Sequence, residues 1–215
     1  MSQPSYALVD PRPIAASAPY TFFLPSHAEL AGVRSGDVVK LMFEYAQETQ
    51  KWAVERMWVI VHVADGETLK GELNNDPDEP TSPLQAGNQV IFQRHHIVSI
   101  EAPDSGTATL PIAQREYWER CLVDECVLEG SEPVEVLYRE KPDMQQDGDR
   151  YPDSGWRIRG RMQNATDEEI DNRKAAYVSV GAVLNKDDSW LPFLDAAIGT
   201  RLMRDFTADI YVQEK

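Results

Sequence analysis

Histidine and cysteine are the side chains from which a metal site in this chain would have to be built. They are His27, His62, His95, His96, Cys121 and Cys126. No pair of them has the C-x-x-C or H-x-x-x-H spacing of common zinc sites. His95 and His96 are adjacent, and neighbouring residues of a strand point to opposite faces, so the two rings should not share one metal ion. We therefore expect no metal ligand and no cofactor site.

Ser154 and Cys121 are the candidate nucleophiles. Ser154 lies in Asp153-Ser154-Gly155, which lacks the G-x-S-x-G pattern of a nucleophile elbow. The three residue types favour a turn. Cys121 lies among apolar residues, which favours a buried structural thiol. On a predicted helix, Cys121 and Cys126 would have their Cα atoms too far apart for a disulfide. The sequence therefore predicts no catalytic residue and a protein that is not an enzyme.

The chain is strongly acidic. Its 215 residues include 21 Lys and Arg and 36 Asp and Glu, for a formal net charge of −15. Nucleic acids and anionic membranes are bound mainly through clustered basic residues, so neither is an expected partner. The first residues lack the basic and apolar regions of a signal peptide, and no apolar run approaches the length of a membrane span. We expect a cytoplasmic protein that attracts basic protein partners.

Trp190 and three acidic residues near it are the candidate partner-binding residues. Trp190 follows Asp187 and Asp188 and precedes an apolar segment. An exposed aromatic ring beside acids would anchor a basic protein, although a place in the core is the alternative for Trp190. Asp195 lies inside the apolar segment 191–198, where a carboxylate needs a partner or a role. A cap on the following turn and a binding surface are both open explanations for Asp195.

The elements that would position these residues form two groups. In the N-terminal half, strands are predicted at 20–24, 38–45, 56–63, 68–73, 89–92 and 97–100. Asp65-Gly66 predicts a hairpin turn, and Ser26 with Glu29 has the form of a capping box that opens a short helix. Residues 1–19 lack periodicity, so a loose arm is expected there.

The C-terminal half mixes helices and strands. An amphipathic helix is predicted from Pro111 to Glu129, ending at Gly130, and a short helix from Thr166 to about Lys174. Strands are predicted at 134–139, 156–161, 177–184 and 208–213, with an exposed loop at 141–153. The expected class is α+β, with two small units that each form a curved, mostly antiparallel sheet with one or two short helices. The expected domains are 1–102 and 108–215.

Three motifs in the N-terminal half carry a family resemblance. They are Met57-Trp58-Val59, Gly71-Glu72-Leu73-Asn74-Asn75-Asp76-Pro77 and Gly87-Asn88-Gln89-Val90. In this order they resemble a small bacterial family known only as domain of unknown function twenty-three fourteen. Asn88 stands where that family usually has Asp. The resemblance covers residues 36–100.

Three other motifs, in residues 150–208, resemble bacterial immunity protein family thirty-three. They are Asp153-Ser154-Gly155-Trp156, Val183-Leu184-Asn185 at an expected strand end, and the segment from Leu191 to Thr200, in which Ala197 replaces the usual Pro. The resemblance implies an antitoxin-like protein that binds and blocks a toxin.

The sequence thus favours a non-enzymatic binding protein that occludes a cationic toxin. Two alternatives remain open at this stage. One is a standalone regulatory or scaffold module with an unidentified ligand. The other is a metal-assisted hydrolase that uses His95 or His96 with nearby acids.

Overall fold

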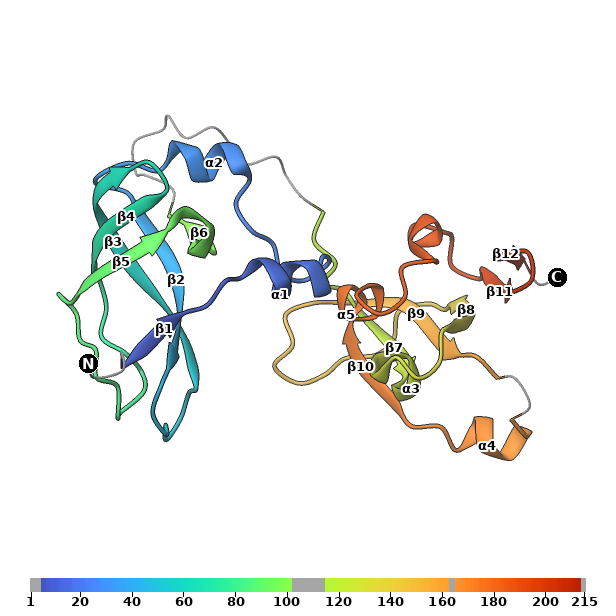
Figure 1. Ribbon diagram of the computed structural model, residues 1–215. Coiled ribbons are helices and arrows are strands. Elements are labelled where there is room, and N and C mark those ends of the chain that lie inside the picture. The colour runs from blue at the N-terminus through green and yellow to red at the C-terminus, as the bar shows by residue number, and fades with distance from the viewer. Residues whose placement is uncertain (1–4, 102–114, 163–164, 214–215) are drawn as a thin grey trace. The chain divides into compact units, whose positions relative to one another are not determined.

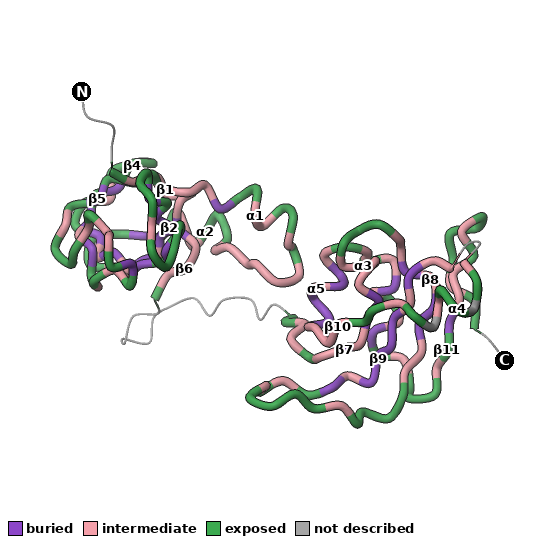
Figure 2. Tube along the Cα trace, turned by 90° about the horizontal axis from the view of Figure 1, so that it is seen from below, coloured by how far each residue is buried: buried purple, intermediate pink, exposed green. Residues whose placement is uncertain are grey.

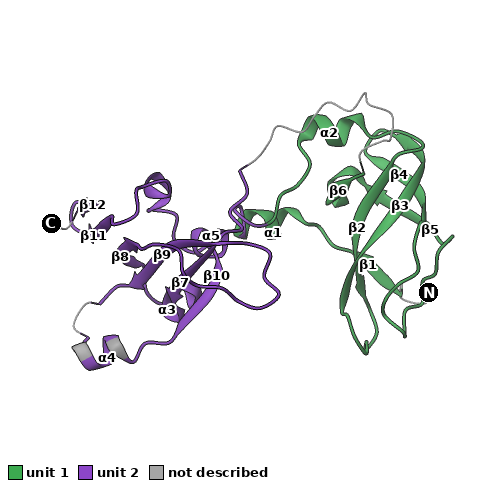
Figure 3. Cartoon of the chain, turned by 180° about the vertical axis from the view of Figure 1, so that it is seen from behind, with its two compact units in different colours: residues 1–17, 22–113 green, residues 18–21, 114–215 purple. Residues whose placement is uncertain are grey.

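The computed structural model describes residues 5–101, 115–162 and 165–213. The chain divides into two compact units (Figure 3): residues 1–17 with 22–113, and residues 18–21 with 114–215. Residues 18–21, which the sequence places in the first domain, therefore belong to the second unit. The residues between the two predicted domains lie outside the described part of the chain.

The first unit is built on a curved antiparallel sheet (Figure 1). Its strands follow the order β1-β2-β3-β4-β5, and β6 pairs with β2. The elements are β1 (Tyr6–Leu8), α1 (Arg12–Ser17), α2 (His27–Gly32), β2 (Val38–Tyr45), β3 (Val54–Asp65), β4 (Thr68–Leu73), β5 (Gln89–Gln93), the 3-10 turn η1 (Arg94–His96) and β6 (Ser99–Ile100). The predicted hairpin at Asp65-Gly66 and the capping box of Ser26 with Glu29 are confirmed.

The core of the first unit follows the two-residue period of its strands. Alternate residues Val39, Leu41 and Phe43 of β2 are fully buried, and they pack with alternate residues of β3, β4 and β5. Gly71 of β4 faces β3 so closely that a Cβ would collide with the backbone oxygen of Ile60. The sheet therefore needs glycine at this position.

Two expectations for the N-terminal residues are wrong. Residues 1–19 contain β1 and α1 in place of a loose arm, because β1 pairs with β2 and the Tyr6 ring packs 5.4 Å from that of Phe43. Residues 20–24 form no strand. Tyr20 and Thr21 bond instead to Asn185 of the second unit. In both places, contacts distant in sequence override local propensity.

The second unit is a six-stranded sheet in the order β10-β7-β9-β8-β11-β12, in which only the β7–β9 pair is parallel. The elements are β7 (Arg120–Asp124), α3 (Glu125–Glu129), β8 (Val134–Arg139), β9 (Asp153–Gly160), α4 (Asp167–Asp171), β10 (Ala175–Ser179), α5 (Val180–Leu184), the 3-10 turn η2 (Leu191–Phe193), β11 (Arg201–Asp205) and β12 (Ile210–Gln213). Together the two sheets and short helices confirm the α+β class.

The core of the second unit lies on one face of this sheet. Strand residues such as Cys121, Trp156 and Ile158 pack there against α3 and α5, which contribute Val127 and Val183. Figure 2 shows the resulting buried segments at the centre of the unit. α3 and α5 therefore cover the same face of the sheet.

Two predicted elements of the second unit are wrong in type. The start of the helix predicted from Pro111 to Glu129 lies outside the described residues. Within its described part, residues 120–124 form β7, and only residues 125–129 are helical. The strand predicted at 177–184 changes to helix after Ser179, whose hydroxyl accepts a hydrogen bond from Ala182 N at 3.3 Å. Short apolar runs fit a buried strand or a buried helix equally well, so periodicity did not separate them. Strand β11 was not predicted.

No helix among the described residues is long and apolar enough to cross a membrane.

Candidate partner-binding surface

Asp187 is a structural joint between α5, β8 and β11. Its carboxylate accepts hydrogen bonds from Val134 N at 2.8 Å and Ser189 N at 3.0 Å. It also forms an ion pair with Arg204 at 3.1 Å, and only 13% of its side chain is exposed. Because these neighbours already satisfy the carboxylate, Asp187 holds the loop that carries Asp188.

Asp188 is exposed and holds residues 18–21 on the second unit. Its carboxylate accepts a hydrogen bond from the Tyr20 hydroxyl at 2.7 Å. This bond, with some burial, raises the pKa of Tyr20 to about 12. Asn185 accepts from Tyr20 N at 2.9 Å and donates to Thr21 Oγ1 at 2.7 Å. The Asn185 side chain, which ends α5, therefore fixes the same segment.

Trp190 lies in the core, so the candidate interpretation as an exposed anchor is wrong. Its side chain has no exposed surface, and its ring packs edge-on against Trp156 with the ring centres 5.8 Å apart. Trp156 Nε1 donates to Leu194 O at 3.1 Å, whereas Trp190 Nε1 has no acceptor among the described residues. The apolar segment after Trp190 folds back over the sheet, and this buries the ring. Trp190 can therefore only support the surface above it.

Asp195 is exposed and paired with a single arginine. Arg115 donates to both of its carboxylate oxygens, at 2.7 and 2.8 Å. This hydrogen-bonded pair lowers the pKa of Asp195. Because the side chains are 78% and 51% exposed, the pair contributes little to stability. Asp195 keeps its negative charge and is accessible to a partner.

The Asp153-Ser154-Gly155-Trp156 motif builds the start of β9. Asp153 accepts from Gly155 N at 3.0 Å, and it forms an ion pair with Arg157 at 2.9 Å in a buried position. Ser154 Oγ donates to Arg120 O at 2.7 Å. Within the described ranges, Ser154 Oγ bonds to backbone groups and to no general base, and the motif serves the fold.

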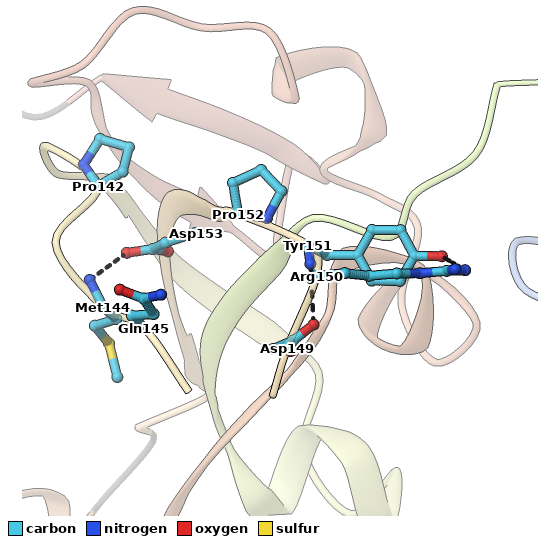
Figure 4. Close-up of a pocket in the computed structure, with 8 residues that line it drawn as sticks. All are labelled: Pro142, Met144, Gln145, Asp149, Arg150, Tyr151, Pro152 and Asp153. Carbon is cyan, nitrogen blue, oxygen red and sulfur yellow. Dashed lines mark hydrogen bonds between the residues drawn. The ribbon is translucent and has the colours of Figure 1, made fainter. Parts of the chain in front are cut away.

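An open hollow lies beside this motif, in the loop between β8 and β9 (Figure 4). It has a volume of about 380 Å³ and is lined by Pro142, Met144, Gln145, Asp149, Arg150, Tyr151, Pro152 and Asp153. The two aspartates of the lining are both paired with arginines, Asp149 with Arg120 and Asp153 with Arg157.

The sheet face opposite the core, which we call the open face, carries aromatic residues and arginines. At its centre Arg157 and Val136 are buried, whereas Arg201 and Val212 nearer the β12 edge are exposed. Paired positions on five neighbouring strands place Tyr177, Leu122, Arg157, Tyr138 and Arg201 in one row across it. The next row along the strands contains Arg159, Val136, Met203 and Val212. Aromatic residues, Met and Arg are enriched at protein interfaces. No sequence pattern had marked this face, because its residues come from six separate strands.

The histidines and cysteines are arranged differently from the expectation. His95 and His96 lie in η1, not in a strand, and their ring centres are 4.3 Å apart. His96 Nδ1 accepts a hydrogen bond from Gln93 N at 3.1 Å. Among the described residues, no three His, Cys, Asp or Glu side chains gather as a metal would require. Cys121 and Cys126 are free, and burial raises the pKa of the Cys121 thiol, so it is protonated at neutral pH.

Comparison with known proteins finds one family match in each half of the chain. Residues 121–213 match the immunity protein Imm33 domain family. Residues 23–101 match a family described as an uncharacterized protein conserved in bacteria, DUF2314. Searches of curated proteins and of solved structures gave no match. These two assignments confirm the resemblances seen in the sequence motifs, and the first supports a general role in toxin immunity.

The Imm33-matching region contains the acids, the open face and the hollow described above. Its motif residues make contacts that stabilise the fold: Asp153 pairs with Arg157, Trp156 packs on Trp190, and Asn185 accepts a hydrogen bond from Tyr20 N. The residues that make the motif recognisable are thus committed to the fold. Asp153, Gly155 and Trp156 are also buried.

The DUF2314-matching region is held together by buried acids. Glu79 is 2% exposed and accepts hydrogen bonds from the N–H groups of residues 50, 51, 52 and 81. Glu55 accepts from Asp78 N at 2.7 Å and from the Tyr45 hydroxyl. In the motif itself, Asn75 accepts from Trp58 N at 2.8 Å. These side chains hold the loops at 46–53 and 74–88 on the sheet.

Acidification is expected to weaken the first unit through Glu79. Burial raises the pKa of Glu79, but hydrogen bonds from Thr81 and from the N–H groups of residues 50–52 outweigh it and hold the pKa below its usual range. The stabilisation is therefore complete above the unfolded pKa of about 4.3 and is lost as the pH falls toward the folded pKa. Urea unfolding of the full chain at a series of pH values measures this loss. Hydrogen exchange of β4 assigns the affected transition to the first unit.

The matched variant for this test is Glu79→Gln. It should be less stable than the natural chain at neutral pH, and the stability of its first unit should depend less on pH between about 5 and 2. Equal pH dependence of the two proteins would show that other acids cause the effect.

Proposed function

We propose that this protein is a toxin-immunity protein that binds a basic toxin domain and blocks it without chemistry of its own. The observation that carries the proposal is the match of residues 121–213 to the immunity protein Imm33 domain family. An immunity protein needs a stable surface that complements its toxin.

The charge of both units supports a basic partner. Residues 114–215 contain 14 Lys and Arg and 22 Asp and Glu, a net charge of −8, and residues 1–113 contain 7 and 14, a net charge of −7. Charge of one sign over both units accelerates encounter with a partner of the opposite sign. Asp188 and Asp195 are exposed members of this field and are our proposed contacts for the toxin.

The condition of the reactive groups supports a binding role. The Cys121 thiol is buried, Ser154 bonds to backbone, and the Asp153 carboxylate is paired with Arg157. The structural contacts of these three groups therefore leave none of them activated as a nucleophile among the residues that the structure describes. The free cysteines are compatible with the reducing cytoplasm, where we propose that the protein acts.

Co-expression tests the proposal directly. The full chain is produced in a bacterial host together with the toxin domain encoded beside its gene, and the surviving cells are counted. We expect survival with the full chain and death with an unrelated acidic protein of similar charge. Death in both cultures would contradict the immunity role.

The salt dependence of binding tests the charge mechanism separately. Association of the full chain with a catalytically inactive form of that toxin domain is measured from low salt to about 0.5 M, where charges more than a few ångströms apart are screened. We expect the association rate to fall about tenfold or more. A rate that stays constant would contradict electrostatic attraction while leaving the immunity role intact.

Removing two of the exposed charges gives the matched variant for the salt experiment. Asp188→Asn with Asp195→Asn should slow association at low salt by about twofold and leave the rate at high salt unchanged, since rim charges act mainly on encounter.

A further inference from the structure

Strand β12 (Ile210–Gln213) is an edge of the second sheet. It pairs with β11 over four residue pairs, from Leu202 with Gln213 to Asp205 with Ile210. In the described part of the chain, no strand pairs with its other side. An edge strand presents backbone N–H and C=O groups that can pair with a strand of another protein.

The side chains of β12 leave this edge apolar on the open face. Ile210 is 56% exposed and Val212 is 52% exposed. They lie two residues apart and so on the same face, and Val212 is paired with Met203 there. Met203 continues this strip inward along the same row, as far as the buried Val136.

The other face of β12 is anchored in the core. The Tyr211 hydroxyl donates to Val134 O at 3.2 Å and lies 3.1 Å from Ser189 Oγ. Its ring packs edge-on against Phe193 with ring centres 5.5 Å apart. The strand is therefore held in place before any partner binds, which lowers the entropy cost of docking.

Apart from its short length of four residues, β12 lacks the usual protections of an edge. Ile210, Tyr211, Val212 and Gln213 include no charge and no proline, and their pairing with β11 is regular, without a bulge. Natural edge strands commonly use such features to prevent pairing with other chains. An edge without charge, proline or bulge, beside exposed apolar side chains, can accept a strand of another chain.

The charges around β12 distinguish a basic partner from a second copy of this chain. In the turn that leads into β12, Asp209 is paired with Arg204 at 2.7 Å, and Asp205 accepts hydrogen bonds from Thr207 N and Ala208 N. Both acids are exposed, and the unit as a whole carries a net charge of −8. A second copy would bring an equal negative charge to the same edge, which opposes association. A basic segment would be attracted to it.

We infer that β12 is the docking edge for the toxin, and that an extended basic segment of the toxin adds to the sheet as a seventh strand. This inference rests on the proposed function. Main-chain hydrogen bonds along β12 would supply affinity, Ile210 and Val212 would contact apolar side chains of the added strand, and the neighbouring acids would select Lys and Arg.

The test uses the full chain and the inactive toxin domain encoded beside its gene. Ile210→Asp with Val212→Asp removes the apolar strip but adds negative charge. We expect binding to weaken about 100-fold, as for central apolar contacts of an interface, although the added charge would favour a basic partner. Ile198→Asp is the matched control, because Ile198 is 59% exposed and lies outside β12. It should change affinity less than about twofold.

Hydrogen exchange provides the backbone readout. On toxin binding, amides of β12 should exchange at least about tenfold more slowly, while those of β10, the opposite edge of the sheet, should keep their rates. Equal binding by the double variant, or unchanged β12 exchange in a chain that still protects cells, would overturn this inference and leave the immunity role standing. A chain that neither binds nor protects would overturn both. A homodimer with β12 amides already protected would show that a second copy occupies the edge.

Discussion

Replacing Asp153 by alanine is expected to lower the free energy of unfolding of the second unit by about 3–5 kcal/mol, because it leaves a buried arginine without its main partner. Arg157 is 4% exposed, and both of its Nη atoms donate to Asp153, at 3.0 and 2.9 Å. Glu140 and Asp143 also contact Arg157, but their side chains are largely exposed and compensate poorly. The alanine would also leave Gly155 N without its acceptor.

The charge of Asp153 is secured in the folded state. Burial raises the pKa of Asp153, but the Arg157 guanidinium and the N–H groups of Gly155 and Met144 outweigh it, so the pKa lies below its usual value. The measurement is calorimetric unfolding of the full chain, with hydrogen exchange of β9 to assign the affected transition to the second unit.

Asp195→Ala is the matched control for Asp153→Ala. It also removes an aspartate that pairs with an arginine, but at an exposed site, where a loss below about 1 kcal/mol is expected. Similar losses for the two variants would show that burial does not decide the strength of these pairs.

Replacing Gly155 by alanine is expected to cost about 3 kcal/mol or more, because two penalties combine at one position. The backbone of Gly155 has a φ of +80°, which L side chains rarely adopt. A Cβ would also collide with the backbone oxygen of Glu140, to which Gly155 is bound through the hydrogen bond from Glu140 N to Gly155 O at 2.8 Å. The collision is with backbone, so it cannot be relieved by a side-chain rotation.

Gly199→Ala separates the two penalties. Gly199 has a φ of +92°, and its missing Cβ points into open space. Only the conformational cost of about 1–2 kcal/mol is expected there. Thermal unfolding of both variants measures the difference, and a Gly155→Ala variant as stable as Gly199→Ala would contradict the predicted collision.

Asp153→Ala and Gly155→Ala both change the fold of the second unit and not its exposed surface. Asp153 and Gly155 belong to its most recognisable motif, yet both serve the start of β9. Loss of toxin protection in either variant would therefore report unfolding, whereas the β12 variants change exposed side chains of a folded unit.

The strands with clear alternation were predictable from sequence. The segment 38–45 was predicted with both ends correct, and the hairpin through Asp65-Gly66 followed from its turn residues. Each pattern is local: alternate burial within one strand, or the backbone angles of one turn. Segments without such a pattern, such as 120–124 and 180–184, took the structure that their neighbours in space required.

The candidate site divides in the same way. Net charge and the acidity of Asp187, Asp188 and Asp195 follow from composition, and so does the expectation of a basic partner. The burial of Trp190 does not follow from composition. A ring between polar and apolar residues can point to solvent or to the core, and here its packing against Trp156 of the sheet places it in the core.

The sequence by itself determined the class of the fold, the acidic charge and the two family resemblances, because each depends on residue type or on short motifs. Only the tertiary structure decided which acids are exposed, which face of the second sheet is open and which strand forms its edge. Those properties depend on strand order, and strand order is set by contacts between residues far apart in the chain.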